Sequence, residues 1–226
     1  MNSRWKFPYF WYKINFPEME RLYDFKVEIF MIDTMALQGF GSKDFSSKEE
    51  IENRKFEQYQ WLEFELANSE ADFIVVAGHH PIFSISTHGP TKILVDELLP
   101  ILEKYNVNFY VCGHDHQLQF LKYKENNNDS KFNQKPQFVV AGMATLPNPR
   151  RANRNSLPDY IENKFFYSKT GLKSHGGYVQ FVIYGDKIRV YYIDAKTDEV
   201  IYSSSSGKRV IPGKVVDNDK PCRACS

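Results

Sequence analysis

The sequence has no surplus of charge and is poor in cysteine. Its 226 residues contain 29 lysines and arginines against 28 aspartates and glutamates, so the net charge is +1. A near-neutral chain offers no electrostatic basis for binding nucleic acid or an anionic membrane, so we expect neither partner. Three cysteines are too few for a disulfide framework. We expect Cys112 to be a small buried residue, and Cys222 and Cys225 to lie in a frayed tail.

Long apolar runs and several common enzyme motifs are also missing. No stretch reaches the roughly 18 consecutive apolar residues of a membrane helix. The first residues, Met1 to Lys6, lack the basic-then-apolar layout of a signal peptide. There is no H-E-x-x-H, no G-x-S-x-G and no glycine-rich phosphate loop. Metalloproteases, α/β-hydrolases and P-loop proteins therefore fit the sequence poorly.

The sequence does contain an alternation of predicted strand, helix and strand. Phe73–Ala77 and Val107–Cys112 are continuous apolar runs, typical of strands buried on both faces, with a helix expected to begin near Pro90 between them. Pro100 predicts a kink in that helix. This order predicts a parallel βαβ unit, hence an α/β fold. Further strands are expected over 7–16, 27–32, 137–141, 178–184 and 187–194, and a helix capped by Ser46 or Ser47 with apolar residues Phe56, Tyr59, Leu62 and Leu66.

Other segments are expected to be irregular. A glycine- and serine-rich loop covers 39–47, and a polar loop covers 124–135 with a glycosylation sequon at Asn128. A long loop is expected from residue 142 to about 173, and the chain beyond Tyr202 is expected to fade into a serine-rich tail. We assign residues 1–210 to one domain and 211–226 to a polar, disordered tail.

Five of the six histidines lie between positions 79 and 116. His79 follows the first buried strand, and His114 and His116 follow the second, each cluster being preceded by a glycine. Because sites gather at the carboxyl ends of parallel strands, we expect these three imidazoles to share one cavity. Neutral imidazole is a common ligand of zinc, iron and nickel, so metal binding is the leading interpretation. Buried structural histidines are the alternative.

The remaining histidines, His80, His88 and His175, are candidates for substrate contact or for structural roles. His88 precedes the second helix, where it either contacts an anionic substrate or protonates a leaving group, or serves only the loop structure. For His80 a role in catalysis, through leaving-group protonation or phosphate binding, and a structural role are about equally supported. His175 is expected to be structural. Three histidines do not complete a metal site, so carboxylates must contribute, and the sequence after His116 offers no obvious ones.

Several runs, in order, resemble the purple acid phosphatases of the metallophosphoesterase superfamily, and among them the small tartrate-resistant type. The runs are Arg4-Trp5-Lys6-Phe7-Pro8, Phe30-Met31-Ile32-Asp33-Thr34, Val76-Ala77-Gly78-His79-His80-Pro81, His88-Gly89-Pro90-Thr91 and Tyr110-Val111-Cys112-Gly113-His114-Asp115-His116. The resemblance implies the C-terminal portion of a four-layer α/β/β/α sandwich. It also implies hydrolysis of phosphate monoesters at acidic pH by a monomeric, lysosomal or secreted enzyme.

The resemblance further implies a binuclear centre of Fe(III) with a divalent iron or zinc ion. In it His79 and His114 would bind the divalent ion and His116 the ferric ion, while His88 would assist substrate binding and leaving-group protonation. His80 replaces a tyrosine common in the family and is expected to affect phosphate contacts.

The chain also departs from the family pattern. The family's other ligands come from an aspartate motif, a G-D-N-x-Y motif and a G-N-H-D motif, none of which occurs here. We expect these motifs to lie before Met1, so that this chain carries part of the site. The alternative is an inactive phosphatase-like scaffold or component of a complex.

Overall fold

The computed structural model describes residues 8–40, 47–125, 134–144, 147–168 and 175–212. They form a seven-stranded sheet in the order β1-β2-β3-β4-β6-β5-β7 and a three-stranded sheet in the order β10-β9-β8. The strands are β1 (Tyr12–Asn15), β2 (Val27–Met31), β3 (Phe73–Ala77), β4 (Phe109–Cys112), β5 (Leu118–Tyr123), β6 (Gln137–Ala141), β7 (Ile161–Tyr167), β8 (Gly177–Ile183), β9 (Lys187–Asp194) and β10 (Val200–Gly207).

The centre of the large sheet is parallel. β2, β3, β4 and β6 run in the same direction, while β1, β5 and β7 pair antiparallel. The crossovers between β2, β3 and β4 are helical, which confirms the predicted βαβ arrangement. The helices are α1 (Pro17–Tyr23), α2 (Thr34–Leu37), α3 (Lys48–Ala67), a π-helical turn η1 (Leu94–Leu98) and α4 (Leu99–Lys104).

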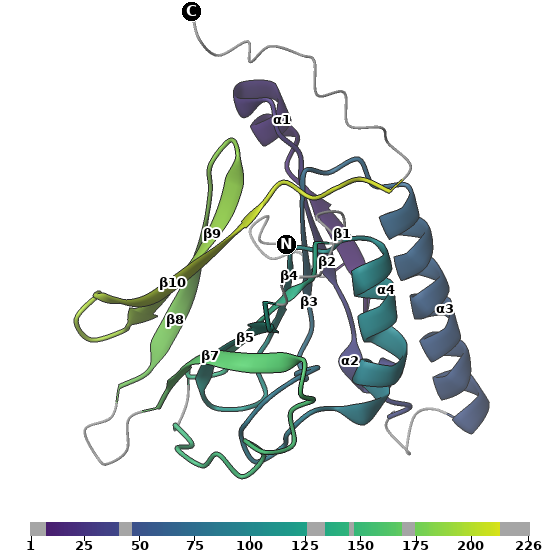
Figure 1. Ribbon diagram of the computed structural model, residues 1–226. Coiled ribbons are helices and arrows are strands. Elements are labelled where there is room, and N and C mark those ends of the chain that lie inside the picture. Colours follow the sequence, from purple (N-terminus) through teal and green to yellow (C-terminus); the bar gives the residue numbers. More distant parts are fainter. Residues whose placement is uncertain (1–7, 41–46, 126–133, 145–146, 169–174, 213–226) are drawn as a thin grey trace, which may run out of the picture.

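Alternating side chains of the central strands divide the core into two layers. Ile74 and Val76 face the helices, and Phe73 and Val75 face the small sheet. Figure 1 shows α3 and α4 on one side of the large sheet and β8, β9 and β10 on the other. The described residues thus form a helix layer and two sheet layers, in agreement with the α/β phosphoesterase fold predicted from the resemblance.

The helix α3 begins where the sequence predicted. The Ser47 hydroxyl accepts a hydrogen bond from the Glu50 backbone N–H, and the Glu50 carboxylate accepts one from the Ser47 N–H, which completes a capping box. Leu62 and Leu66 are buried as expected, but Phe56 is 61% exposed. Its assignment to the apolar face was therefore wrong, since that face turns toward the sheet only further along the helix.

The predicted kink at Pro100 takes the form of a change in helical register. The turn Leu94–Leu98 is π-helical, and α4 begins directly after it with Pro100 in its first turn. Proline has no N–H to donate to the preceding turn, so a wider turn there removes the conflict.

Three other expectations were wrong. Within the described residues, the strand expected over 7–16 is formed only over Tyr12–Asn15, as β1, and the helix α1 follows it with Pro17 in its first turn. β7 lies inside the expected loop 142–173, where Phe165, Phe166 and Tyr167 gave a β signal that was overlooked. β10 includes the serine run of the expected tail, because pairing with β9 outweighs the low β propensity of that run.

Some sequence features fall outside the described residues. These are the sequon at Asn128, most of the glycine-rich loop, Cys222, Cys225 and the tail from residue 213. Cys112 is buried and its thiol lies 3.6 Å from the Val139 carbonyl oxygen, as expected of a small core residue. Among the described helices, none combines the length and apolarity needed to cross a membrane.

Candidate metal and phosphate site

The ends of two neighbouring parallel strands bring the histidine clusters together. Ala77, the last residue of β3, pairs with Val111 of β4, so His79 and His114 leave the same edge of the sheet. Gly78 begins the first turn, where the chains approach closely. A Cβ atom at Gly78 would lie 2.6 Å from Cγ2 of Thr34 and 2.9 Å from the Tyr110 hydroxyl. Glycine is therefore required for His79 and His80 to reach the cluster.

His79 and His114 form the centre of the site. Nδ1 of His114 lies 3.1 Å from Nε2 of His79, and one nitrogen each of His79, His80 and His114 lies within 4.8 Å of the others. Two imidazole nitrogens bound to one ion at about 2.0–2.1 Å are roughly 3.0–3.4 Å apart. The nitrogens of His79 and His114 therefore suit one first-row metal ion, and no carboxylate of the described residues belongs to the group.

The lowered pKa and the backbone conformation of His114 both favour a role in metal binding. Burial, with help from neighbouring His88 and His79, lowers the pKa of His114 below its usual value, which favours the neutral, metal-binding form. Its backbone has φ +58°, a left-handed conformation that is uncommon for a residue with a side chain. Strain of this kind concentrates at functional sites.

His80 is held by Thr34, the first residue of α2. Its Nδ1 lies 2.8 Å from the hydroxyl of Thr34, and its backbone N–H donates to the same oxygen at 3.0 Å. The Tyr110 hydroxyl donates to the His80 carbonyl at 2.6 Å. Burial, followed by the neighbouring imidazoles of His114 and His79, lowers the pKa of His80 to about 4. When Nδ1 donates to Thr34, Nε2 remains for a metal ion or a substrate.

The short helix α2 fixes Thr34. The Asp33 carboxylate caps α2 by accepting from the N–H groups of Met35 and Ala36 at 2.9 and 3.2 Å. Buried Gln58 of α3 bonds both the N–H and the carbonyl of Asp33, at 2.7 and 3.0 Å. Two helices thus determine where the partner of His80 stands.

His88 is paired with a buried carboxylate. Its Nδ1 lies 2.5 Å from Oδ1 of Asp115, a residue only 1% exposed, and its ring packs 4.1 Å from that of His114. Ser84 donates its hydroxyl to the other oxygen of Asp115. Because Asp115 holds Nδ1 of His88, Nε2 is the nitrogen left to contact a substrate.

The other two histidines lie apart from this group. His116 is exposed and its backbone carbonyl accepts from Asn148 at 3.0 Å, but its ring nitrogens are not in the group formed by His79, His80 and His114. His116 still contributes to the lowered pKa of His114. His175 bonds Asp194 through Nε2 at 2.7 Å, outside the cluster.

Sequence reasoning missed Asp115 and Thr34 as parts of the site. The signal for Asp115 was its place between His114 and His116, where a carboxylate can orient an imidazole. Thr34 gave no comparable signal, since its contact with His80 depends on the register between β2 and β3.

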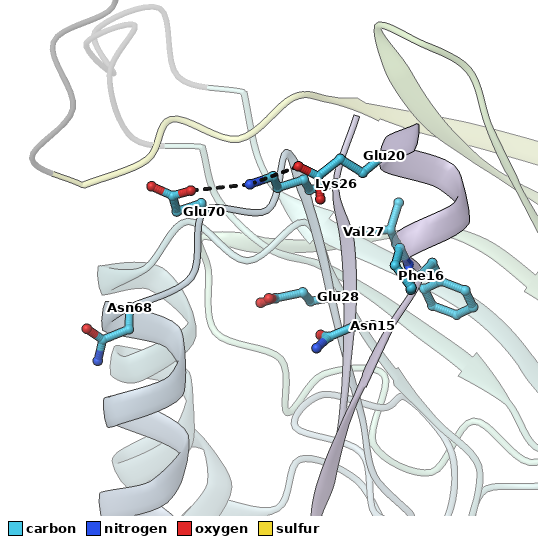
Figure 2. A pocket seen from close by; sticks show the side chains of 9 residues that line it. Asn15, Phe16, Glu20, Lys26, Val27, Glu28, Asn68 and Glu70 are labelled. Carbon is cyan, nitrogen blue, oxygen red and sulfur yellow. Dashed lines mark hydrogen bonds and ion pairs between the residues drawn. The ribbon is translucent and has the colours of Figure 1, made fainter. Parts of the chain in front are cut away.

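A second cavity lies at the opposite end of the strands, near the start of β2. It measures about 390 Å³, and Figure 2 shows Lys26 between Glu20 and Glu70, with ion-pair distances of 3.2 and 3.3 Å. The Glu28 carboxylate also lines it. Three carboxylates against one ammonium disfavour a phosphate there. The histidine cluster is therefore the candidate site for phosphate chemistry.

Comparison with known proteins agrees with this geometry. A model of the calcineurin-like phosphoesterases matches residues 6–118, which include all the histidines of the cluster. Tartrate-resistant acid phosphatase type 5 of Oryctolagus cuniculus is 36% identical over 200 residues, which are 86% of this chain and 57% of the relative. The chain therefore spans a little over half the length of this relative.

Two solved structures share the fold at low identity. One is described as "GAP50 the anchor in the inner membrane complex of Plasmodium", with TM-score 0.64 and 22% identity over 92% of this chain and 57% of that one. The other is the purple acid phosphatase PPD1 from yellow lupin (Lupinus luteus) seeds, with TM-score 0.61 and 14% identity over 88% of this chain and 33% of that one. From the matched residues, the fold and the cluster at the strand ends, the chain belongs to the calcineurin-like phosphoesterase family.

Proposed function

We propose that this chain supplies the histidine part of a binuclear metal centre that hydrolyses phosphate monoesters at acidic pH. The observation that carries the proposal is the pair of facing nitrogens on His79 and His114, 3.1 Å apart at the edge where two parallel strands end. The identity of 36% with an acid phosphatase supports the choice of reaction. The proposal also includes a lysosomal or secreted location for the protein.

In this proposal His79 and His114 hold the divalent ion, iron or zinc, and His116 contributes to the Fe(III) site. Bound ions would neutralise charge that develops on the phosphoryl oxygens. The lowered pKa values of His80 and His114 favour the neutral form of these imidazoles more than in an ordinary histidine. Because the histidine group contains no carboxylate, the second ion needs ligands from outside it.

His88 acts on the leaving group. Asp115 holds the proton of Nδ1, which leaves Nε2 to donate a proton to the departing oxygen of the substrate. His80, whose ring packs 4.4 Å from that of His114, binds a phosphate oxygen when its Nε2 carries the proton. Asp115 is a positioning residue, since it acts on the substrate only through His88.

A second candidate is a non-catalytic component of a larger assembly. The absence of a carboxylate from the histidine group of the described residues favours it, as does the fold shared with the protein described as an anchor in Plasmodium. In this case the histidines retain a structural role or bind one ion without turnover.

Metal content and turnover separate the two candidates. For this chain alone we expect weak binding of one ion and negligible hydrolysis of p-nitrophenyl phosphate at pH 5. In the protein that carries the complete ligand set, we expect two ions and turnover that His114→Ala abolishes and His175→Ala largely preserves. A complete protein that binds two ions but hydrolyses no phosphate monoester would contradict the enzyme proposal and support the second candidate.

A further inference from the structure

A cavity of about 470 Å³ adjoins the loop that carries His88. Ile85 contributes to its wall and precedes His88 by three residues, so their Cα atoms are at most roughly 11 Å apart. The wall of the cavity therefore lies close to His88 along the chain. The lining residues are Ile85, Lys124, Arg151, Arg154, Asn155, Leu157, Pro158, Asp159, Ile161, Glu162 and Asn163.

Three cations line this cavity, and its two arginines are not neutralised. Arg151 stacks its guanidinium 4.1 Å from the Phe166 ring centroid, and Arg154 donates to Asn155 at 3.4 Å. Within the part of the chain that the structure describes, neither arginine forms an ion pair with a carboxylate. Of the two acidic lining residues, Glu162 is engaged by Lys164 at 3.0 Å. The arginine side of the cavity therefore offers free donors to an anion.

A buried donor without a partner points to the same kind of ligand. Nδ2 of Asn163 is inaccessible to solvent and has no hydrogen-bond acceptor. Leaving a buried donor unpaired is costly, so such groups call for a missing acceptor. An anion in the cavity would supply acidic partners for the two arginines, and Asn163, another lining residue, is a donor left without an acceptor.

The segment from Arg151 to Arg154 is hydrogen-bonded to the loop that carries His88. Asn153, between Arg151 and Arg154, donates its side-chain amide to the carbonyls of Ser86 and Thr87 at 2.6 and 3.1 Å. Its backbone N–H donates to Ile85 at 3.1 Å. Asn153 therefore holds the segment between the two arginines against the loop that carries His88.

We propose that this cavity is a second anion subsite, which selects phosphate monoesters that carry another anionic group beside the scissile phosphate. The inference rests on the proposed function, because it assumes that the scissile phosphate lies at the histidine cluster. Arginine forks bind phosphate and carboxylate oxygens with paired hydrogen bonds, and the second group comes either from acidic side chains of a phosphopeptide or from a second phosphate of a small molecule.

Calorimetric binding to this chain in the presence of Zn²⁺ tests the subsite without requiring turnover. One arm compares a phosphoserine peptide followed by three glutamates with the same peptide followed by three glutamines. The other arm compares 1,3-propanediol bisphosphate with its monophosphate. Each probe is titrated into the unsubstituted chain, the double variant Arg151→Gln/Arg154→Gln and the control Arg150→Gln, which removes a charge from the same segment outside the cavity wall. Circular dichroism verifies that each variant folds.

We expect at least one doubly anionic probe to bind about tenfold more tightly than its partner. The arm that shows the preference identifies the source of the second anion. This preference should persist in Arg150→Gln and disappear in the double variant. Equal binding of the two probes within both pairs overturns the subsite. It is also overturned if the preference for the doubly anionic probe survives in the double variant, or if Arg150→Gln loses that preference as fully as the double variant does.

The variants His79→Ala and His114→Ala separate this inference from the proposed function. If they weaken the binding of both members of a pair while the arginine-dependent preference persists, both proposals are supported. If singly charged probes require the histidines but no preference exists, the subsite alone is wrong. If the preference persists and neither histidine affects binding, the proposed phosphate site is wrong, and with it the subsite's role in choosing substrates.

Discussion

Oδ1 of Asp115 lies 2.5 Å from Nδ1 of His88, and this contact ties the exposed His88 to a buried carboxylate in the segment that follows β4. The same carboxylate also accepts a hydrogen bond from Ser84, so its orientation is fixed from a second side. A hydrogen bond at one nitrogen of an imidazole fixes the protonation of that nitrogen and leaves the other nitrogen to exchange a proton.

Asp115→Asn should therefore impair proton donation more than phosphate binding. In the active protein, we expect kcat for an alkyl phosphate to fall roughly 100-fold, because its poor leaving group needs a proton. For p-nitrophenyl phosphate, whose leaving group needs less assistance, the loss should be much smaller. Steady-state kinetics with both substrates measure the difference. Equal losses for the two substrates would show that Asp115 does not act through proton transfer by His88.

Gly89 is expected to tolerate no side chain. Its φ is +68°, and a Cβ atom would lie 2.7 Å from Cγ of Asn153, the residue that fastens the His88 loop. Gly89→Ala should lower the free energy of unfolding by about 1–3 kcal/mol, measured by urea denaturation. Gly185→Ala is the matched control, since nothing lies within 4 Å of its added Cβ and its φ is not in the left-handed region. Similar losses in both variants would refute the steric explanation.

The capping box of α3 should make a pH-dependent contribution to stability. Ser47→Ala removes the cap and should cost about 1 kcal/mol in the free energy of unfolding, whereas exposed Ser203→Ala should cost far less. Hydrogen bonds from the backbone and side chain of Ser47 lower the pKa of Glu50 below its ordinary value of 4.5. The charged carboxylate is therefore favoured in the folded state, and its contribution is complete only above pH 4.5.

Acidification should remove the contribution of Glu50. As the pH falls from 4.5 through the lowered pKa of the folded state, the unfolded chain binds a proton first, so the advantage of the native protein over Glu50→Gln declines. Urea denaturation of both proteins at several pH values measures this decline. A stability difference that stays constant from pH 6 to pH 3 would contradict the capping role of the carboxylate.

The sequence predicted the part of the fold that is governed by local pattern. β3 has the predicted bounds because a strand buried on both faces is a continuous apolar run, and Ser47 caps α3 as its spacing to Glu50 indicated. β10 was missed because its serine run has no such pattern, and its pairing with β9 is a tertiary effect.

The same distinction between local pattern and tertiary contact applies to the candidate site. His79 and His114 lie 3.1 Å apart, since strand ends bring residues far apart in the sequence to one edge, whereas His116, which was expected in the same cavity, is not a member of their group. The contact of Thr34 with His80 was not predictable, because it depends on strand register and on the fastening of Asp33 by Gln58.

The metal-binding role of His114 is the central claim, and titration with Co²⁺ followed by its visible absorption tests it most directly. His114→Ala is compared with His175→Ala, because His175 bonds Asp194 outside the cluster and controls for the loss of any imidazole. Our account predicts that the unsubstituted chain and His175→Ala bind one ion with the same absorption band, and that His114→Ala loses both the ion and the band. Undiminished binding by His114→Ala, or equal loss in the two variants, would contradict it.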